Sequence, residues 1–352
     1  MSARAALVVG ATGVTGAPLC EQLLNEGWRV NAFSRRVPQL APGTPLDGLS
    51  HLALDLDDVA RTNAALAERP DITHVFYCAN SPSAEARKEM IRSLLDGLEN
   101  LPRFANINFI QGMKYYGCHL GPFPTPAKET DPRVPGCDFY YTEEDMIQAR
   151  QDGRAWTWTT LRPHSVCGTS AGNPVNVASA LAVYASMQRA QGDTLPFPGT
   201  ERTFRTLFQV ADAGLLARAA IHVSTMERGR NRTFNINNGD YFRWESLWPA
   251  IAAFFGLKPG APSGTFLTEI FEQQKPVWDA LVRDHALAPF PYDRLPRWSL
   301  GEYQAPNSRL ACEYDVIADT VRLRQAGFCE AMDSGVMFQK IFGQLRAERL
   351  IP

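Results

Sequence analysis

Short apolar runs alternate with longer segments that are apolar every three or four residues through the first half of the chain. The short runs predict buried strands, which we place at residues 5–9, 29–33, 52–57, 74–78, 106–110 and 156–161. The segment after the first run carries Leu19, Leu23 and Leu24 at helical spacing, and Gly27 follows as a helix-terminating signal. Strands that alternate with helices form a doubly wound parallel sheet, so we predict an α/β fold of the Rossmann type.

The second half of the chain is more helical and richer in aromatic residues. Helices are predicted at residues 174–188, with Asn173 as the N-cap, and at 316–324 and 335–346. Residues 235–237 instead predict a return of the chain to the sheet. We therefore expect a nucleotide-binding domain in residues 1–168 with a return segment near 207–240, and a smaller, mainly helical substrate-binding lid in residues 169–352.

A glycine turn joins the first predicted strand to the first predicted helix. Its sequence is Gly10-Ala11-Thr12-Gly13-Val14-Thr15-Gly16. Glycines at this spacing let the main chain approach a pyrophosphate, and the helix N-terminus offers its unpaired N–H groups to the phosphates. A nucleoside-triphosphate loop is excluded because Ala17-Pro18 stand where it needs Lys and Ser or Thr. The expected cofactor contacts are Gly10, Thr12, Gly13, Val14 and Gly16.

The end of the second predicted strand bears on the choice of cofactor. An Asp or Glu there would bind the ribose hydroxyls of NAD, whereas this chain has Ser34-Arg35-Arg36. Two guanidinium groups suit a 2′-phosphate, so we predict NADPH/NADP+; the alternative is that these arginines form a solvated turn. Further contacts are expected at the strand ends, namely Asp55 and Leu56 near the adenine, and Ala79, Asn80, Gln111, Tyr140, Pro163 and Val166 toward the nicotinamide.

Two polar side chains are candidates for the chemistry. Lys114 comes just past the predicted strand at residues 106–110, and Tyr140 stands where a helix is expected to begin. Most short-chain dehydrogenases carry the catalytic Tyr and Lys on one helix, four residues apart, but Glu144 occupies that position here. The lysine must therefore come from another segment, at the carboxyl edge where α/β sheets bind ligands. Tyr141 is the alternative to Tyr140 as the catalytic residue. Without a catalytic role, either tyrosine would serve to pack the helix against its neighbours.

Together these motifs resemble those of the progesterone 5β-reductase and iridoid synthase family, a group of atypical extended short-chain dehydrogenases. The resemblance runs in order through nearly the whole chain, on Gly10 to Gly16, Ser34-Arg35-Arg36, Thr73 to Tyr77, Lys114-Tyr115-Tyr116, Gly121-Pro122-Phe123, Phe139-Tyr140-Tyr141 with Glu144-Asp145, Arg162-Pro163, Phe234 to Asp240 and Lys275 to Trp278. It implies NADPH-dependent reduction of the C=C bond of α,β-unsaturated aldehydes or ketones, in which Tyr140 stabilises the enolate oxygen and Lys114 supports it. The substrate would be a small apolar enone or enal, in a pocket to which we assign Tyr116, Phe123 and Tyr184.

Three departures from the family pattern lie near the expected substrate. The family usually has Trp-Ala-Asn where this chain has Cys78-Ala79-Asn80, and the stretch from Tyr116 to Gly121 is longer than usual. His164-Ser165 replace the usual Gly-Asn, and we interpret His164 as a hydrogen-bonded structural histidine. The reaction type therefore carries over better than the substrate does. Glu143, Glu144 and Asp145 are interpreted as acids in the first turns of a helix capped by Asp138, where the helix dipole favours them.

Composition and charge narrow the range of partners. The chain of 352 residues is 45% hydrophobic with a formal net charge of −2, so neither nucleic acid nor an anionic membrane is favoured. Its 7 cysteines are scattered and never spaced Cys-x-x-Cys, which fits reduced thiols better than disulfides or a zinc site, and no metal is expected. The N-terminus does not read as a signal peptide and no apolar run approaches about 18 residues, so we expect a cytoplasmic protein. The sequence leaves the oligomeric state, including a homodimer, open.

Two other functions remain as alternatives. A nucleotide-sugar epimerase or another extended short-chain dehydrogenase acting on a carbonyl or alcohol would normally keep Tyr and Lys four residues apart. A non-catalytic NADP(H)-sensing regulator would commonly lack the active-site tyrosine. The presence of both Lys114 and Tyr140 without that spacing favours the enone reductase.

Overall fold

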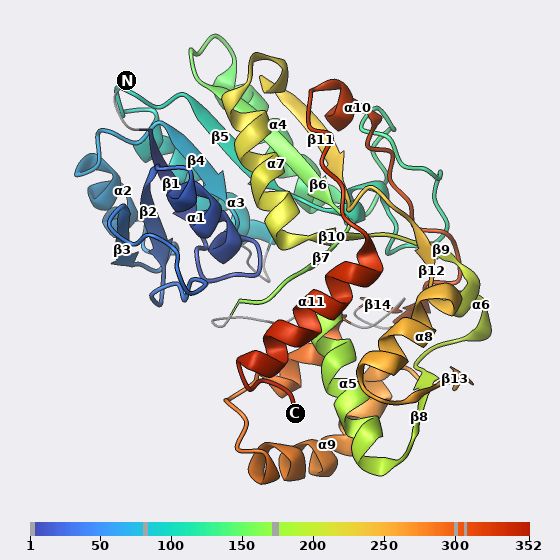
Figure 1. The fold of residues 1–352 in the computed structure, drawn as a ribbon. Coiled ribbons are helices and arrows are strands. Elements are labelled where there is room, and N and C mark those ends of the chain that lie inside the picture. Colours follow the sequence, from blue (N-terminus) through green and yellow to red (C-terminus); the bar gives the residue numbers. More distant parts are fainter. Residues whose placement is uncertain (1–3, 80–83, 171–175, 299–301, 306–307) are drawn as a thin grey trace.

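The computed structural model describes residues 4–79, 84–170, 176–298, 302–305 and 308–352 (Figure 1). Its centre is a seven-stranded sheet with the order β11-β6-β5-β4-β1-β2-β3, and every pairing in it is parallel. The strands are β1 (Ala5–Val9), β2 (Arg29–Ser34), β3 (Leu49–Ala53), β4 (His74–Tyr77), β5 (Asn106–Ile110), β6 (Thr157–Pro163) and β11 (Arg232–Ile236). The predicted α/β fold class is confirmed, as is the return of the chain to the sheet at residues 235–237, which fall at the end of β11 and just beyond it.

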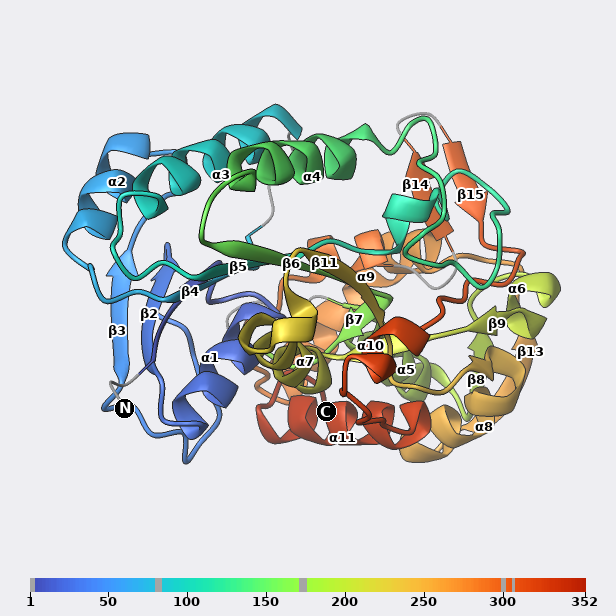
Figure 2. The same ribbon diagram turned by 90° about the horizontal axis from the view of Figure 1, so that it is seen from above.

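Helices cover both faces of the sheet (Figure 2). One face carries α1 (Gly16–Asn25) and α7 (Ala213–Thr225), and the other carries α2 (Val59–Ala67), α3 (Ala84–Leu98) and α4 (Asp138–Gln151). Leu19 and Leu216 of the first layer pack with Val8 of β1 in one apolar cluster, and Leu94 of the second is in another cluster with Leu7 of β1. Alternate side chains of β1 therefore bury against opposite layers, which is why its sequence is apolar throughout.

The remaining elements lie beyond the carboxyl edge of the sheet or connect its helices and strands. The helices and helical turns are η1 (Met113–Tyr116), α5 (Val177–Gln191), α6 (Glu201–Arg205), η2 (Glu227–Gly229), α8 (Trp244–Phe254), α9 (Leu267–Asp284), η3 (Tyr292–Trp298), α10 (Val321–Gln325) and α11 (Ser334–Ala347). The short strands are β7 (Ser165–Cys167), β8 (Thr194–Phe197), β9 (Leu207–Phe208), β10 (Val210–Asp212), β12 (Phe242–Arg243), β13 (Lys258–Pro262), β14 (Glu302–Ala305) and β15 (Ser308–Ala311). Trp244, Trp248 and Phe197 form the aromatic centre of the largest apolar cluster, which α5, α8, α9 and α11 enclose.

The structure moves several predicted boundaries. The third strand ends at Ala53 rather than Asp57, because its pairing with β2 ends where β2 ends, at Ser34↔Ala53. The helix predicted from residue 174 begins at Val177. The side chain of Asn176 caps it by accepting hydrogen bonds from the main-chain N–H groups of Ala178 and Ser179. Asn173 lies outside the described residues.

Two further helix starts differ from the prediction. Cys137 stands at the N-cap position of α4, and Asp138 is its first helical residue rather than its cap. The helix predicted at residues 316–324 is reduced to the short α10. The residues before it are held in extended pairing, since the Val316 N–H donates to the carbonyl of Leu207 at 3.0 Å and Ala318 bridges to Ala127.

The strand order reverses at β1, because β2 and β3 follow on one side of it and β4, β5, β6 and β11 on the other. In open α/β sheets, ligands bind outside the carboxyl ends of the strands at this reversal. The candidate residues at positions 10–16, 79, 111–114 and 163–166 all follow or end strands on that edge. No helix among the described residues is long and apolar enough to cross a membrane.

Candidate active site

The glycine turn after β1 is held tightly between two neighbouring strands. Gly10 has φ +84°, and a Cβ built on it would lie 2.8 Å from the main-chain nitrogen of Ala79, just past β4. Its N–H donates to the carbonyl of Phe33 at 2.9 Å. A Cβ on Gly16 would collide with the Gly10 carbonyl, so that glycine allows α1 to start directly beneath the turn. The two outer glycines are therefore required for close packing.

The same turn leaves room for a pyrophosphate. Among the described residues, a Cβ on Gly13 would meet only the Gly10 carbonyl, at 3.4 Å, which is an ordinary contact distance. The N-cap of α1, Thr15, makes no side-chain capping bond, and no acidic residue lies in the first turn. Pro18 has no N–H and the N–H of Ala17 donates to the carbonyl of Gly13 at 3.0 Å, so the donors offered to an anion would come from the turn itself and from Gly16, at the positive end of the helix dipole. Thr12 and Val14 lie half-buried in this turn, and the Ser170 hydroxyl donates to the carbonyl of Thr12 at 3.0 Å.

The arginines predicted to bind a 2′-phosphate lie at the end of β2. The Ser34 hydroxyl donates to the carbonyl of Arg36 at 2.7 Å and lies 3.3 Å from Nε2 of His51, so it organises this turn. Arg35 and Arg36 are exposed. His51 was not predicted from the sequence, because it lies beside Ser34 only through the pairing of β3 with β2. This chemistry suits the adenosine phosphate end of a dinucleotide.

The remaining predicted cofactor contacts are distributed along the same edge. Asp55 is exposed and Leu56 half-buried, just beyond β3. Ala79 is half-buried beyond β4, whereas Asn80 lies outside the described residues. Val166 of β7 is half-buried, and a Cβ on Gly168 would lie 3.3 Å from the side chain of Val14. The segment after β6 therefore packs against the glycine turn, so the residues predicted to contact the nicotinamide adjoin those predicted to contact the pyrophosphate.

Tyr140 lies at the carboxyl edge of β5. A Cβ built on Gly112 would lie 3.2 Å from its phenol oxygen and 3.7 Å from the carbonyl oxygen of Pro163, so the phenol stands over the main chain just past β5 and beside the end of β6. Gln111 is buried, and its side-chain amide donates to the carbonyl of Tyr140 at 3.3 Å. Burial raises the pKa of the phenol to about 12, and the guanidinium of Arg87 acts in the opposite direction. A phenol of this kind stays protonated at neutral pH and can donate a hydrogen bond.

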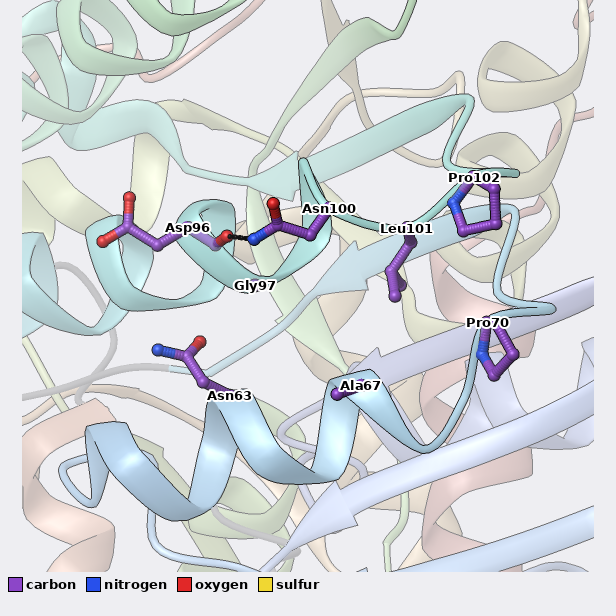
Figure 3. Close-up of a pocket in the computed structure, with 8 residues that line it drawn as sticks. All are labelled: Asn63, Ala67, Pro70, Asp96, Gly97, Asn100, Leu101 and Pro102. Atoms are coloured by element: carbon purple, nitrogen blue, oxygen red, sulfur yellow. Dashed lines mark hydrogen bonds between the residues drawn. The ribbon is translucent and has the colours of Figure 1, made fainter.

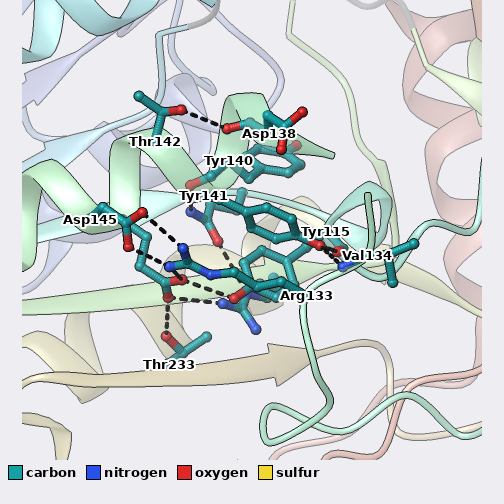
Figure 4. A network of polar contacts seen from close by, with 12 residues as sticks. Tyr115, Arg133, Val134, Asp138, Tyr140, Tyr141, Thr142, Asp145 and Thr233 are labelled. Atoms are coloured by element: carbon teal, nitrogen blue, oxygen red, sulfur yellow. Dashed lines mark hydrogen bonds and ion pairs between the residues drawn. The ribbon is translucent and has the colours of Figure 1, made fainter. Parts of the chain in front are cut away.

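Tyr141 has a different environment from its neighbour (Figure 4). Its hydroxyl donates to the carbonyl of Tyr115 at 2.7 Å and accepts from the N–H of Val134 at 2.7 Å. Its ring meets that of Tyr115 edge-on, with centroids 4.7 Å apart. Both hydrogen-bonding capacities of this hydroxyl are used within the protein, which leaves Tyr140 as the tyrosine that faces the edge of the sheet.

Lys114 belongs to η1, the helical turn that directly follows β5. Its side chain is exposed, on the same segment as Gly112, over which the phenol of Tyr140 stands. His119 lies close enough to Lys114 to feel its charge. Burial is the larger cause and the charge of Lys114 the smaller cause that lower the pKa of the imidazole to about 4. The imidazole is neutral at pH 7 and adds no positive charge beside the lysine. His119 falls within the longer loop between Tyr116 and Gly121, and the sequence did not mark it as part of the site.

The acids after Tyr141 were interpreted as acids in the first turns of the helix that the helix dipole favours, but two of them are buried and pair with arginines of other elements. Glu143 is buried and forms an ion pair with the equally buried Arg87 of α3, whose Cζ lies 5.7 Å from the ring centroid of Tyr140. Glu144 is buried and accepts from Arg162 of β6 at 2.9 Å. Only Asp145 is exposed, where it pairs with Arg133 (Figure 4). Residues three and four positions beyond Tyr140 lie on the same face of the helix as Tyr140. This spacing could have indicated from the sequence that Glu143 and Glu144 lie beside the site.

The predicted pocket residues belong to, or pack on, the largest apolar cluster but contact different neighbours. The Tyr116 hydroxyl donates to the side chain of Asn235 at 2.5 Å, and the Tyr184 hydroxyl donates to the carbonyl of Pro196 at 2.7 Å. Phe123 is half-buried and meets the ring of Tyr314 edge-on. Their contact with substrate stays a prediction.

His164 has the structural role that was expected of it. Its ring is buried, lies 3.1 Å from the carbonyl of Val316 through Nε2, and accepts from the N–H of Ser165 through Nδ1. Burial lowers the pKa of this imidazole to about 3, so it is neutral at physiological pH. It links the end of β6 to the C-terminal segment through its contact with the carbonyl of Val316.

A cavity of about 430 Å³ lies elsewhere, between the C-terminal ends of α2 and α3 (Figure 3). Its lining residues are Asn63, Ala67, Pro70, Asp96, Gly97, Asn100, Leu101 and Pro102. These residues precede β4 and β5, so the cavity opens at the amino edge of the sheet, opposite the glycine turn. It holds none of the candidate catalytic or cofactor-binding residues.

The fold is that of the short-chain dehydrogenase/reductase superfamily of oxidoreductases, and the glycine turn after β1 is of the kind that binds a dinucleotide. The family model that describes a PRISE-like Rossmann-fold domain matches residues 6–352. The chain belongs to this family.

Known relatives and structures agree with the assignment. The chain is 29% identical to the short chain dehydrogenase gsfE of Penicillium aethiopicum, over 99% of both chains. It is 27% identical to the (S)-8-oxocitronellyl enol synthase of Antirrhinum majus, over 99% of this chain and 92% of that one. The solved structure of UDP-glucose 4-epimerase from Thermus thermophilus covers 97% of this chain with a TM-score of 0.65 at 18% identity, a likeness that concerns the fold alone.

Proposed function

We propose that the protein is an NADPH-dependent reductase of the C=C bond of α,β-unsaturated aldehydes and ketones. The observation that carries the proposal is the phenol of Tyr140, which stands over Gly112 at the carboxyl edge of the sheet while the lysine comes from η1 instead of the tyrosine's own helix. The similarity to enol synthases supports it, because an enol is what 1,4-addition of hydride to an enal forms first. A small apolar enone or enal is the proposed substrate.

The cofactor would be held by the residues already described along the strand ends. Main-chain N–H groups of the glycine turn and of Gly16 at the start of α1 would bind the pyrophosphate, and Arg35 and Arg36 would bind the 2′-phosphate that distinguishes NADPH. When bound, the nicotinamide supplies the hydride. The segment from Pro163 to Val166 would border it, since these residues end β6 and form β7 beside the glycine turn.

Tyr140 would act on the carbonyl oxygen of the substrate. Hydride addition at the β-carbon moves negative charge onto that oxygen, and a preorganised hydrogen-bond donor there contributes roughly a hundred- to a thousandfold in rate. Because burial raises the pKa of the phenol to about 12, Tyr140 donates a hydrogen bond and keeps its proton. The enolate then takes its proton from solvent, so no tuned proton relay is required.

Lys114 would supply a positive charge beside the same oxygen and the cofactor ribose. Its ammonium stands on the turn that follows Gly112, while the neighbouring His119 is neutral at pH 7 because burial and Lys114 lower its pKa to about 4. Among the described residues, this edge therefore offers the phenol of Tyr140 as a donor and the ammonium of Lys114 as a cation for a developing oxyanion. This arrangement suits stabilisation of an enolate better than stepwise proton transfer to a carbonyl.

A substrate panel tests the proposal. Purified protein is incubated with NADPH and linear enals, cyclic enones, a steroid enone and the matching saturated ketones, and products are identified by mass spectrometry. The proposal expects NADPH oxidation with the unsaturated compounds and saturated carbonyl products. Oxidation of NADPH only with saturated ketones would favour a carbonyl reductase, and binding of NADPH without any turnover would favour a sensor.

A further inference from the structure

The catalytic tyrosine and lysine of this chain are not joined by one helix. In the Tyr-x-x-x-Lys arrangement a single helical turn fixes the separation of the two groups, because residues i and i+4 lie on one face. Here Tyr140 belongs to α4 and Lys114 to η1, and the two residues are 26 positions apart in the sequence. Something other than the helix must keep them in register.

Tyr115, the residue next to Lys114, is bound to α4 through its main-chain carbonyl and its hydroxyl. Its main-chain carbonyl accepts from the hydroxyl of Tyr141 at 2.7 Å, and its own hydroxyl donates to Oε2 of Glu144 at 2.9 Å (Figure 4). All three side chains are buried. The turn that carries Lys114 is therefore pinned to the helix that carries Tyr140, through residues one and four positions after that tyrosine.

A buried guanidinium completes the connection. Arg162 donates to Oε1 of Glu144 at 2.9 Å and places its Cζ 3.1 Å from the ring centroid of Tyr115. It also donates to the side chain of Gln111 at 3.1 Å, and Gln111 donates to the carbonyl of Tyr140 at 3.3 Å. The charge of Glu144 is thus paired, and β5, η1 and α4 meet at one buried centre.

We propose that Tyr115, Tyr141 and Glu144 are positioning residues that hold Lys114 in register with Tyr140, in place of the single helical turn. The inference rests on the proposed function, because it assigns a purpose to the register between the two groups. Glu144 occupies the helical position at which the lysine of a Tyr-x-x-x-Lys motif would stand, and it reaches the relocated lysine through the hydroxyl of Tyr115. Its carboxylate needs the charge of Arg162 to be buried there.

Tyr115→Phe is the sharpest perturbation, because it removes the hydroxyl that bonds Glu144 and keeps the ring that packs on Arg162 and Tyr141. The matched control is Tyr292→Phe, which also removes one buried tyrosine hydroxyl, bonded to the carbonyl of Phe271 at 2.8 Å in the C-terminal half. Both changes are also made in a Lys114→Met background. Hydrogen exchange of residues 113–117 and kcat with an enone are measured for each protein.

The expected results separate positioning from general stability. Tyr115→Phe should raise hydrogen exchange in residues 113–117 and lower kcat about fivefold to tenfold, because a misplacement near 1 Å can cost as much as about a hundredfold. In the Lys114→Met background the same change should lower kcat by less than about twofold, since two residues that act through one another are not additive. Tyr292→Phe should alter neither quantity.

Each contrary result has a distinct meaning. Equal losses of kcat in both backgrounds, or unchanged exchange in residues 113–117, would overturn the positioning role. A wild-type protein that reduces no enone would refute the proposed function instead, and the exchange measurement, which needs no turnover, would then decide alone whether Tyr115 pins the turn to α4.

Discussion

Adding one methyl group at Gly112 should disturb catalysis with little effect on the fold. Gly112 has φ 176° and ψ −179°, an extended conformation that alanine adopts without strain. The new Cβ would lie 3.2 Å from the phenol oxygen of Tyr140, so one of the two must yield by a few tenths of an ångström, while the next neighbour, the carbonyl of Pro163, is at an ordinary 3.7 Å. The substitution therefore acts on the position of the phenol.

The size of the effect follows from that displacement. If a misplacement of about 1 Å costs up to about a hundredfold in rate, a few tenths of an ångström should lower kcat about threefold to fivefold. The melting temperature should change little, because the loss of unfolded-state entropy on replacing glycine stabilises by about 0.4–1 kcal/mol and offsets the tight contact. Steady-state kinetics with a reducible enone and a thermal melt give both numbers.

Two further variants make the reasoning refutable. Gly192 has the matching extended conformation, with φ 178° and ψ −160°, and none of the described residues would crowd an added Cβ within 4 Å, so Gly192→Ala should leave kcat unchanged. In a Tyr140→Phe background the methyl group gains room, and Gly112→Ala should have no further effect on kcat. A threefold to fivefold loss that persists in that background would show that the methyl group acts on something other than the phenol.

Three other predictions concern the cofactor, the catalytic pair and pH. Arg35→Asp should weaken NADPH binding, because it removes a charge that pairs with the 2′-phosphate and adds one that repels it, and cofactor titration should show a much smaller change for NADH. Equal catalytic efficiency of the unmodified protein with NADPH and NADH would contradict the assignment. Tyr140→Phe should lower kcat by roughly a hundredfold or more, and Lys114→Ala should lower it by less, with the affinity for NADPH retained in both variants. Tyr141→Phe should lower kcat less than Tyr140→Phe does. If Tyr141→Phe had the larger effect, the assignment of the two tyrosines would be reversed. Because burial raises the pKa of Tyr140 to about 12, the phenol stays protonated as the pH rises, and kcat should show no alkaline decline below pH 10, which is the ordinary pKa of a tyrosine. A decline of kcat near neutral pH that Tyr140→Phe abolishes would disprove this expectation.

Local signals made much of the nucleotide half predictable from sequence. The apolar run of β1 and the glycines that follow it are dictated by burial on both faces and by close approach, since Gly10 packs on Ala79 and Gly16 on Gly10 itself. Gly27 follows α1 with φ +76°, the left-handed conformation expected of a residue that ends a helix. Such features depend on a few neighbouring residues, which the sequence places side by side.

Features that depend on distant partners were not predictable. Glu144 read as a helix-terminal acid because Arg162, which pairs with it, lies 18 residues away on β6. His51 and Arg87 reach the site only through the pairing of β3 with β2 and the packing of α3 on α4. The third strand was misplaced for a similar reason, because its limits are set by its partner strand rather than by its own apolar residues.

The central claim is tested most directly by following the transferred hydride. NADPH carrying deuterium at C4 of the nicotinamide, on the transferred face, is incubated with the purified protein and a reducible enal, and the product is examined by NMR. The account predicts a saturated aldehyde with deuterium on its β-carbon and an intact carbonyl group. Deuterium on a carbinol carbon, in an allylic alcohol, would show that the protein reduces the carbonyl group and would contradict the account.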